Sequence, residues 1–335
     1  MSSGYDLKEG SLTRNNVDIN EYWAFFNRFF SSSSRNTASY KFGLIKAILD
    51  NLLSVEDTSR GMELSYDSLF SKFAENYWNL VAKYHIRQMR YNGQSYVSKL
   101  ELIIESVLAH SSAIGEIEFE NLSADDRETV ISQVKRDCSR NVIGALYNDF
   151  NGCLYGFDKK EHRIWIHNGA YQFLLAYKIE IEQLNYYAWA KFLEDVNADD
   201  FTKQLISKLE RATPQRKNLS IYRDILRQEF ESNTCYYCGC KLGSNPHVDH
   251  VLPWSFVKSD HLWNFVLSCP KCNIKKKNKL PSRHDLANVI IRNDELKLST
   301  TPFVKSELIG YSDDLMWNIW EYAHSQGYFV YNSAT

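Results

Sequence analysis

Two pairs of cysteines constrain this chain more than any other feature of its sequence. Cys235 and Cys238 form one C-x-x-C pair, and Cys269 and Cys272 form a second pair after thirty intervening residues. Each pair presents two thiolates from one tight turn, and two such pairs are typical of a closed, tetrahedral zinc site. Because four thiolates leave no open coordination position, we expect this zinc to be structural and to take no part in catalysis.

A zinc site, rather than disulfides, also agrees with the compartment that the sequence indicates. The first twenty residues are polar and lack the apolar core of a signal peptide. No apolar run approaches the roughly 20 residues that span a bilayer. We therefore expect a cytoplasmic protein without a membrane partner, in which thiols stay reduced. The other cysteines are interpreted as a bystander beside the first pair, Cys240, and two ordinary buried thiols, Cys138 and Cys153.

Polar residues recur in a fixed order between and behind the cysteine pairs. Asp249-His250 is followed by Asn264 and then, directly behind the last cysteine, by Asn273 and Lys276. This order, interleaved with the four cysteines, resembles the HNH nucleases of the ββα-metal superfamily in their zinc-stapled treble-clef form. The resemblance covers about residues 233–285, and Asn273 stands where the family's name has its final His.

The resemblance implies a role for each of these residues in hydrolysing a phosphodiester bond. His250 is the general base that activates water, since imidazole exchanges protons near neutral pH. Asp249 and Asn273 supply hard oxygen ligands for one catalytic Mg²⁺ or Mn²⁺. Asn264 is a structural residue that fixes the loop and orients His250. His247, two residues before Asp249 on the same strand face, either joins this metal site or stays a neighbouring histidine.

A block of positive charge coincides with the motif. Residues 201–285 carry 15 Lys and Arg against 7 Asp and Glu, whereas residues 1–200 carry 21 against 28. A basic block in a chain of formal charge -2 is typical of a module that binds a polyanion, with a solvated basic face as the alternative. The residues expected to contact nucleic-acid phosphates are Lys275, Lys276, Lys277, Lys279 and Arg283.

Hydrophobic periodicity predicts the organisation of the remaining chain. Residues 1–213 contain no proline, which permits uninterrupted helices. We expect a polar tail over residues 1–17, a mostly helical recognition or partner domain over residues 18–215, and an HNH nuclease domain over residues 216–335. The fold class is α+β, with a ββα-metal module and flanking helices behind the helical domain. Helices are predicted at residues 22–30, 44–53, 66–84, 97–110, 123–139, 170–196, 211–230, 282–293 and 312–325, and a β-hairpin at residues 153–167.

The leading hypothesis is a metal-dependent endonuclease that hydrolyses DNA, with zinc in the scaffold and Mg²⁺ or Mn²⁺ in the active site. Double-stranded DNA is the expected substrate, with single-stranded DNA or RNA as alternatives. A non-catalytic zinc finger that binds nucleic acid or protein is the alternative function. Such a module needs the cysteines and a basic helix but has no use for Asp249, His250 and Asn273.

The biological role follows from the resemblance alone. It implies anti-phage defence or restriction, with a homing or mobile-element nuclease as the alternative. One HNH site cuts one strand, so a homodimer would explain a double-strand break. A partner protein from a defence operon is a further expectation, since toxic nucleases are usually held in check.

Overall fold

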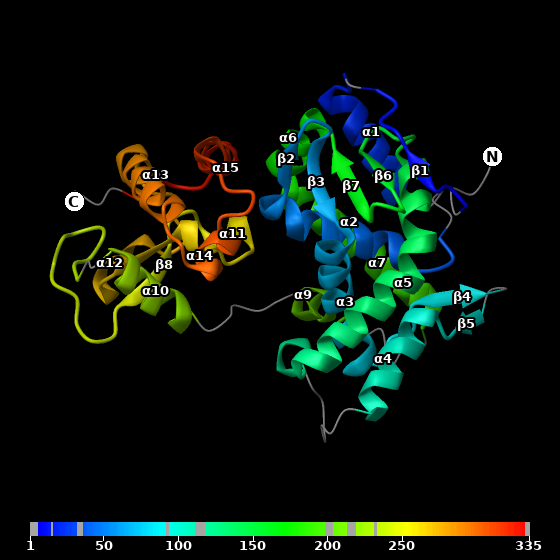
Figure 1. The fold of residues 1–335 in the computed structure, drawn as a ribbon. Coiled ribbons are helices and arrows are strands. Elements are labelled where there is room, and N and C mark those ends of the chain that lie inside the picture. The colour runs from blue at the N-terminus through cyan, green and yellow to red at the C-terminus, as the bar shows by residue number, and fades with distance from the viewer. Residues whose placement is uncertain are drawn as a thin grey trace. The chain divides into compact units, whose positions relative to one another are not determined.

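The computed structural model describes residues 6–14, 16–31, 36–91, 94–110, 118–197, 204–212, 219–230 and 233–331. The chain divides into two compact units, Met1–Gln215 and Arg216–Thr335, which we call unit 1 and unit 2 (Figure 1). Each unit is described by itself. Within the described ranges, no helix combines the length and the apolarity that crossing a bilayer requires.

Unit 1 is built from helices that bury their aromatic faces. They are α1 (Ile19–Phe30), α2 (Tyr40–Asn51), α3 (Tyr66–Ala82), α4 (Lys99–His110), α5 (Ala124–Asp149), α6 (Asn168–Ala176), α7 (Lys178–Val196) and α9 (Leu205–Ala212). α1 begins with a capping box, in which Asp18 and Glu21 each accept the backbone amide of the other. Phe26 of α1 then packs against Phe150 and Phe173, with ring centroids 4.8 and 5.9 Å away.

The centre of unit 1 combines an aromatic core with a buried ion cluster. α3 packs against α2, α4 and α5, and its Trp78 is fully buried. Beside it, the Lys46 ammonium of α2 pairs with Asp50 and lies 3.2 Å from a carboxylate oxygen of Glu182 on α7. Because a buried charge is costly unless it is paired, these three residues specify how α2 meets α7.

Unit 1 also carries a five-stranded antiparallel sheet in the order β1-β6-β7-β3-β2. Its strands are β1 (Glu9–Gly10), β2 (Glu56–Thr58), β3 (Gly61–Ser65), β6 (Tyr155–Asp158) and β7 (Arg163–Ile166). The predicted hairpin at residues 153–167 is confirmed as β6 and β7. β1 lies in the expected polar tail but pairs with β6, so residues 9–10 are part of the fold. A separate hairpin joins β4 (Met89–Tyr91) to β5 (Gln94–Tyr96).

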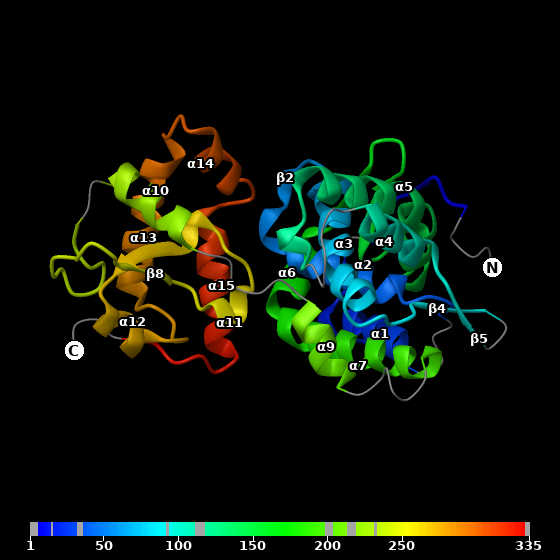
Figure 2. The same ribbon diagram turned by 90° about the horizontal axis from the view of Figure 1, so that it is seen from below.

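Unit 2 contains two antiparallel strands followed directly by a helix. β8 (His247–His250) pairs with β9 (Phe265–Ser268), and α12 (Pro270–Lys276) begins two residues after β9. The flanking helices are α10 (Ser220–Phe230), α11 (Trp254–Val257), α13 (Arg283–Lys297), α14 (Pro302–Glu307) and α15 (Asp313–Ser325). α10 packs against both strands, and α13 packs against α15 (Figure 2). The two units together agree with the predicted α+β class.

The predicted helices are present with shifted ends. α5 continues to Asp149, ten residues beyond the predicted end, and residues 170–196 form two helices, α6 and α7, that meet at Tyr177. The helix predicted at residues 211–230 corresponds to the end of α9 and to α10. Residues 213–218 between them, including the basic Arg216 and Lys217, lie outside the described residues.

Candidate functional site

The four cysteines of the two C-x-x-C pairs come together in unit 2. The sulfur atoms of Cys235, Cys238, Cys269 and Cys272 all lie within 4.8 Å of one another. Ligands about 2.3 Å from a tetrahedral zinc are about 3.8 Å apart, and the Cys238 and Cys269 sulfurs are 3.9 Å apart. The cluster therefore has the ligand type, number and spacing that a structural zinc requires.

Local backbone geometry creates this cluster. Gly239 adopts a φ of +68°, a conformation that glycine reaches without strain, and its amide donates to the Cys235 carbonyl oxygen at 2.8 Å. Cys269 caps the N-terminus of α12, and its sulfur accepts the backbone amide of Cys272 at 3.5 Å. The exposed Cys240 is not part of the cluster of four.

Asp249 lies on β8 and is buried against α12. Its Oδ2 accepts the Tyr237 hydroxyl at 2.6 Å and lies 3.2 Å from the ammonium group of Lys276. Lys276 is fully buried and also donates to the His250 carbonyl oxygen at 2.5 Å. Both contacts use the same carboxylate oxygen of Asp249. The Lys276 contact joins β8 to α12, and the Tyr237 contact joins β8 to the turn of the first cysteine pair.

His250, the next residue on β8, is held by a carboxylate and an aromatic ring. Its Nε2 donates to Asp260 Oδ1 at 2.8 Å, and its ring meets Phe265 edge to face at a centroid distance of 4.5 Å. An ionised carboxylate can only accept, so this bond keeps the hydrogen on Nε2 and leaves the lone pair on Nδ1. The contact therefore prepares His250 to take a proton at Nδ1.

Asn264 fixes the loop that follows β8. Its Oδ1 accepts the Leu252 amide at 2.8 Å, and its Nδ2 donates to the Leu252 carbonyl oxygen at 3.0 Å. Its own carbonyl oxygen accepts the Val251 amide at 2.8 Å. Asn264 is fully buried, so these bonds hold the two residues behind His250 in one conformation.

Asn273 lies on α12 and contacts His247 rather than Asp249. Its Nδ2 donates to His247 Nδ1 at 2.9 Å. Both residues border an open cavity of about 280 Å³ that Arg223 of α10 also lines. Among the described contacts, none joins Asn273 directly to Asp249, so the two expected cation ligands are on the same helix–strand interface without touching.

The basic residues behind the second cysteine pair have different surroundings. Lys275 and Lys277 are exposed, whereas Lys279 is half-buried with its ammonium 5.9 Å from the centroid of the Tyr331 ring. Arg283 opens α13, where it pairs with Glu321 and lies 4.5 Å over the Trp320 ring. The expected phosphate contact of Lys276 is corrected by the structure. Its ammonium group is buried and paired with Asp249, so it positions that carboxylate and is not available to a phosphate.

Burial changes the proton affinity of both groups that contact Asp249. Burial lowers the pKa of the Lys276 ammonium, and the Asp249 carboxylate opposes that shift. Burial also raises the pKa of the Tyr237 hydroxyl, and the nearby Asp249 charge acts in the same direction. Tyr237 is therefore a neutral donor to Asp249 at physiological pH.

Two contributors to this site were not predicted from the sequence. Tyr237 lies inside the first C-x-x-C pair, and Asp260 lies ten residues after His250. Each acts on the site through one side-chain contact, and no spacing rule identifies such a partner. A third contributor, Arg223 of α10, belongs to the basic block of residues 201–285 that indicates polyanion binding.

A comparison with known families agrees with this geometry. Residues 235–282 match the family model of the HNH endonucleases. We call this matched stretch the HNH segment. It spans both cysteine pairs, β8, β9 and α12 and includes none of unit 1. Searches of curated proteins and of solved structures found no match.

Proposed function

We propose that this protein is a metal-dependent endonuclease that hydrolyses phosphodiester bonds in DNA. The observation that carries the proposal is the hydrogen bond between His250 and Asp260. His250 lies next to Asp249 on β8, within the HNH segment. A histidine oriented by a carboxylate is the arrangement that general-base catalysis uses. A zinc finger that only binds has no need for it.

In this proposal His250 activates the attacking water. Nδ1 accepts a proton from the water as its oxygen bonds to phosphorus, while Asp260 stabilises the charge that forms on the ring. The phosphorus–oxygen bond to the 3′ side then breaks, and the leaving oxygen takes a proton from solvent. Asn264 keeps the loop behind His250 fixed during these steps.

Asp249 and Asn273 are the residues that would hold a divalent cation. Their carboxylate and amide oxygens are the hard ligands that Mg²⁺ and Mn²⁺ prefer, and His247 is a third candidate next to Asn273. Such a cation, when bound, supplies charge neutralisation at the phosphate and at the leaving oxygen. Zinc at the four cysteines would hold the treble-clef turns that carry these residues.

DNA would be held by the basic residues that face solvent. Lys275 near the end of α12 and Lys277 directly after it are exposed, and Arg223 borders the cavity beside Asn273. Contacts of this kind set affinity and position without reading base sequence. Arg223, Lys279 and Arg283 are secondary candidates, because an ion pair or an aromatic ring already engages each of them.

A plasmid-nicking assay tests the proposal. Zinc-loaded protein with Mg²⁺ or Mn²⁺ should nick supercoiled DNA, and His250→Ala should lower the rate at least about 100-fold, the typical contribution of a general base. The matched control is His284→Ala, because His284 is an exposed histidine of the same unit. Zinc content and melting temperature should be unchanged in both variants. Equal nicking by His250→Ala and the wild-type protein refutes the assignment.

A non-catalytic DNA-binding zinc module is the second candidate, and one observation favours it. Asp249 and His250 each expose only 6% of their surface, and Lys276 already neutralises the carboxylate that would hold the cation. This candidate predicts DNA binding that is equal with and without divalent cation, and no cleavage. Binding that strengthens with Mg²⁺ and is followed by nicking excludes it.

The biological role in the proposal is anti-phage defence or restriction in the cytoplasm. Unit 1 would recognise a target or a partner protein, and a dimer would allow both strands to be cut. Phage plaque counts on cells expressing the wild-type protein or Asp249→Ala test this role. Equal counts for the wild-type protein and an empty vector contradict a stand-alone defence function.

A further inference from the structure

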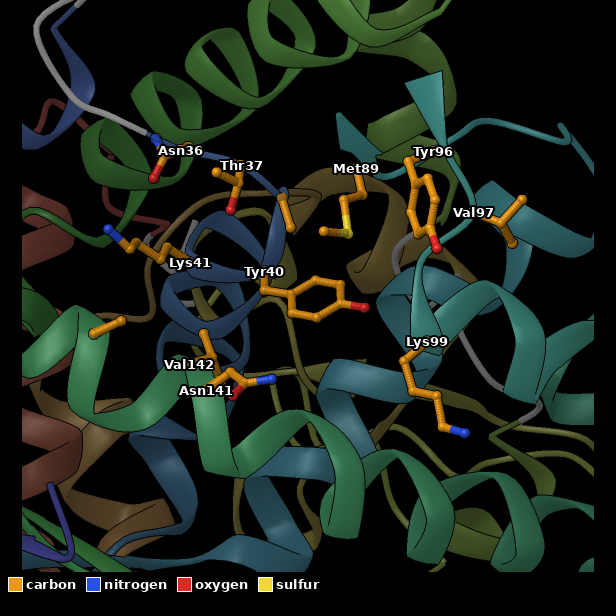
Figure 3. Close-up of a pocket in the computed structure, with 12 residues that line it drawn as sticks. Asn36, Thr37, Tyr40, Lys41, Met89, Tyr96, Val97, Lys99, Asn141 and Val142 are labelled. Carbon is orange, nitrogen blue, oxygen red and sulfur yellow. The ribbon is translucent and has the colours of Figure 1, made fainter. Parts of the chain in front are cut away.

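A cavity in unit 1 has no part in the site described above. Its volume is about 520 Å³, within the range of about 300–1,000 Å³ that is typical of small-molecule sites. Four stretches of the chain line it: the segment that leads into α2, the start of β4, the junction of β5 with α4, and the C-terminal half of α5 (Figure 3). All of them belong to unit 1, so the cavity is complete within one compact unit.

Backbone hydrogen bonds fix the walls of this cavity to each other. The Ser39 amide donates to the Gln88 carbonyl oxygen at 2.9 Å, and the Arg90 amide donates to the Thr37 carbonyl oxygen at 2.9 Å. The buried Ser39 hydroxyl also bonds Gln88 Oε1 at 2.8 Å. The segment before α2 is thereby joined to β4, so the cavity is preformed, as binding sites for small molecules usually are.

The inner surface offers a flat aromatic face. Figure 3 shows the Tyr40 ring in the middle of the cavity, with Met89 and Tyr96 on the side above it. The Tyr40 hydroxyl accepts the Leu100 amide at 3.2 Å, which holds the ring in place at the start of α4. A fixed aromatic ring beside a thioether is suited to a planar ligand, because both groups gain contact by stacking on it.

The cavity also carries basic side chains. The described residues that line it include Lys41 and Lys99, at opposite ends in Figure 3, and among these described residues there is no Asp or Glu. The Lys41 ammonium is paired with Asp149 at 2.7 Å, whereas Lys99 is exposed at the first position of α4. The N-terminal ends of α2 and α4 both reach the lining and add to the positive potential. This contrasts with the acidic balance of residues 1–200 and favours an anionic ligand.

We propose that this cavity binds a nucleotide. The base stacks on Tyr40 against Met89, the Asn141 side-chain amide hydrogen-bonds the edge of the base, and Lys99 pairs with the phosphate. Asn141 lines the cavity from α5 and is exposed, so its donor and acceptor can both reach a ligand. The same chemistry describes a free mononucleotide and a nucleotide within a strand. The proposal is independent of whether unit 2 cleaves DNA.

Calorimetric titration of the full chain without added Mg²⁺ tests the proposal. The probes are AMP, GMP, CMP and TMP, each compared with its nucleoside and with inorganic phosphate. At least one nucleotide should bind, its nucleoside should bind about tenfold more weakly because the Lys99 contact is lost, and phosphate alone should not compete. If no nucleotide binds at millimolar concentration, alone or within an oligonucleotide, the proposal is overturned.

Two variants locate the binding in this cavity. Lys99→Gln should weaken nucleotide binding about tenfold, and Met89→Trp should abolish it by filling the space above Tyr40. The control is Lys160→Gln, an exposed lysine in the turn between β6 and β7. If Met89→Trp loses its circular dichroism spectrum, Lys99→Gln decides alone, since that side chain is exposed. Wild-type affinity in Lys99→Gln overturns the proposal.

A competition experiment distinguishes a free mononucleotide from a nucleotide within a strand as the ligand of this cavity. A short single-stranded oligonucleotide with a 5′-phosphate is titrated in the presence and absence of the tightest mononucleotide. Displacement by the free mononucleotide indicates a shared cavity. Oligonucleotide binding that weakens in Lys99→Gln, with no binding of free mononucleotides, identifies a nucleotide within a strand as the occupant. If neither Lys99→Gln nor Met89→Trp changes the affinity for the oligonucleotide, the oligonucleotide binds outside this cavity. That result, together with no binding of free mononucleotides, overturns the proposal.

Discussion

Replacing Lys276 by Met tests the electrostatics of the candidate active site. Lys276 is fully buried, lies 3.2 Å from Asp249 and donates to the His250 carbonyl oxygen. Methionine keeps most of the side-chain volume, so the change removes a charge and two contacts without a large cavity. The buried Asp249 carboxylate then keeps only one of its two contacts, the hydrogen bond from the Tyr237 hydroxyl.

The expected loss of stability is large. Removing one partner of a buried ion pair costs about 3–5 kcal/mol. Unit 2 spans residues 216–335, and for a domain of this size 1 kcal/mol corresponds to roughly 3–5 °C in Tm. The melting transition of unit 2 should therefore fall by about 9–25 °C. Mg²⁺ should restore part of this loss, because a cation at Asp249 replaces the charge of the missing ammonium.

The assay is thermal unfolding of zinc-loaded protein by circular dichroism, before and after Mg²⁺ is added. Lys275→Met is the matched control, since Lys275 is the exposed neighbour on the same helix and should change stability by no more than about 0.5 kcal/mol. If Lys276→Met and Lys275→Met melt together, the buried pair does not stabilise unit 2 and the reasoning is refuted. If Mg²⁺ leaves the Lys276→Met transition unchanged, Asp249 is not a cation ligand.

Three further predictions concern other parts of the chain. Asp260→Ala should slow plasmid nicking by about 10–100-fold, the effect of losing a charge-assisted hydrogen bond to the general base, with zinc content unchanged; an unaltered rate contradicts the role of Asp260. Removing zinc with a chelator should abolish the melting transition of unit 2 and leave that of unit 1, and two intact transitions would contradict a structural zinc. In unit 1, burial acts to raise the pKa of Asp50, but the Lys46 ammonium and other contacts outweigh it and lower that pKa overall. The stabilisation is therefore present above the unfolded pKa of about 3.9 and is lost as the pH falls through the lower folded value. Asp50→Asn should flatten the decline of unit 1 stability at acid pH, and an identical acid profile would contradict this.

The metal chemistry of unit 2 was predictable because it restricts residue type and spacing. A tetrahedral thiolate site requires two tight turns, and those turns are visible as Cys235-x-x-Cys238 and Cys269-x-x-Cys272. The partners of the candidate catalytic residues follow no such rule. Asp260 reaches His250 from a loop ten residues later, and no spacing rule links a histidine to the carboxylate that orients it. Only the folded chain identifies which acid it is.

Two features of the sequence indicate opposite environments for Lys276. It stands in a run of lysines, which suggested a phosphate-binding face. It also lies four residues after Cys272, and residues four apart share one face of a helix. Because Cys272 faces the core, Lys276 faces it too, and both are buried. Helical position decided the environment of this lysine more than its neighbours in sequence did.

The sheet of unit 1 was predicted only in part for a different reason. β1 and β2 are two and three residues long and largely exposed, so no alternation of apolar and polar residues develops along them. β1 pairs with β6, which is distant in sequence, and β2 pairs with its neighbour β3, which joins the sheet only through the distant strand β7. The long helices were predictable because each presents an apolar stripe over several turns.

The last described residues of the chain are hydrogen-bonded to the end of the HNH segment. The Leu280 amide donates to the Phe329 carbonyl oxygen at 2.8 Å, and the Tyr331 amide donates to the Leu280 carbonyl oxygen at 2.7 Å. The Tyr331 ring meets the Tyr237 ring edge to face at 5.6 Å, and Tyr237 in turn bonds Asp249. A fusion partner or a truncation at this end therefore disturbs Asp249 through the contacts of Tyr331 and Tyr237. Affinity tags and fluorescent reporters belong at the other end of the chain.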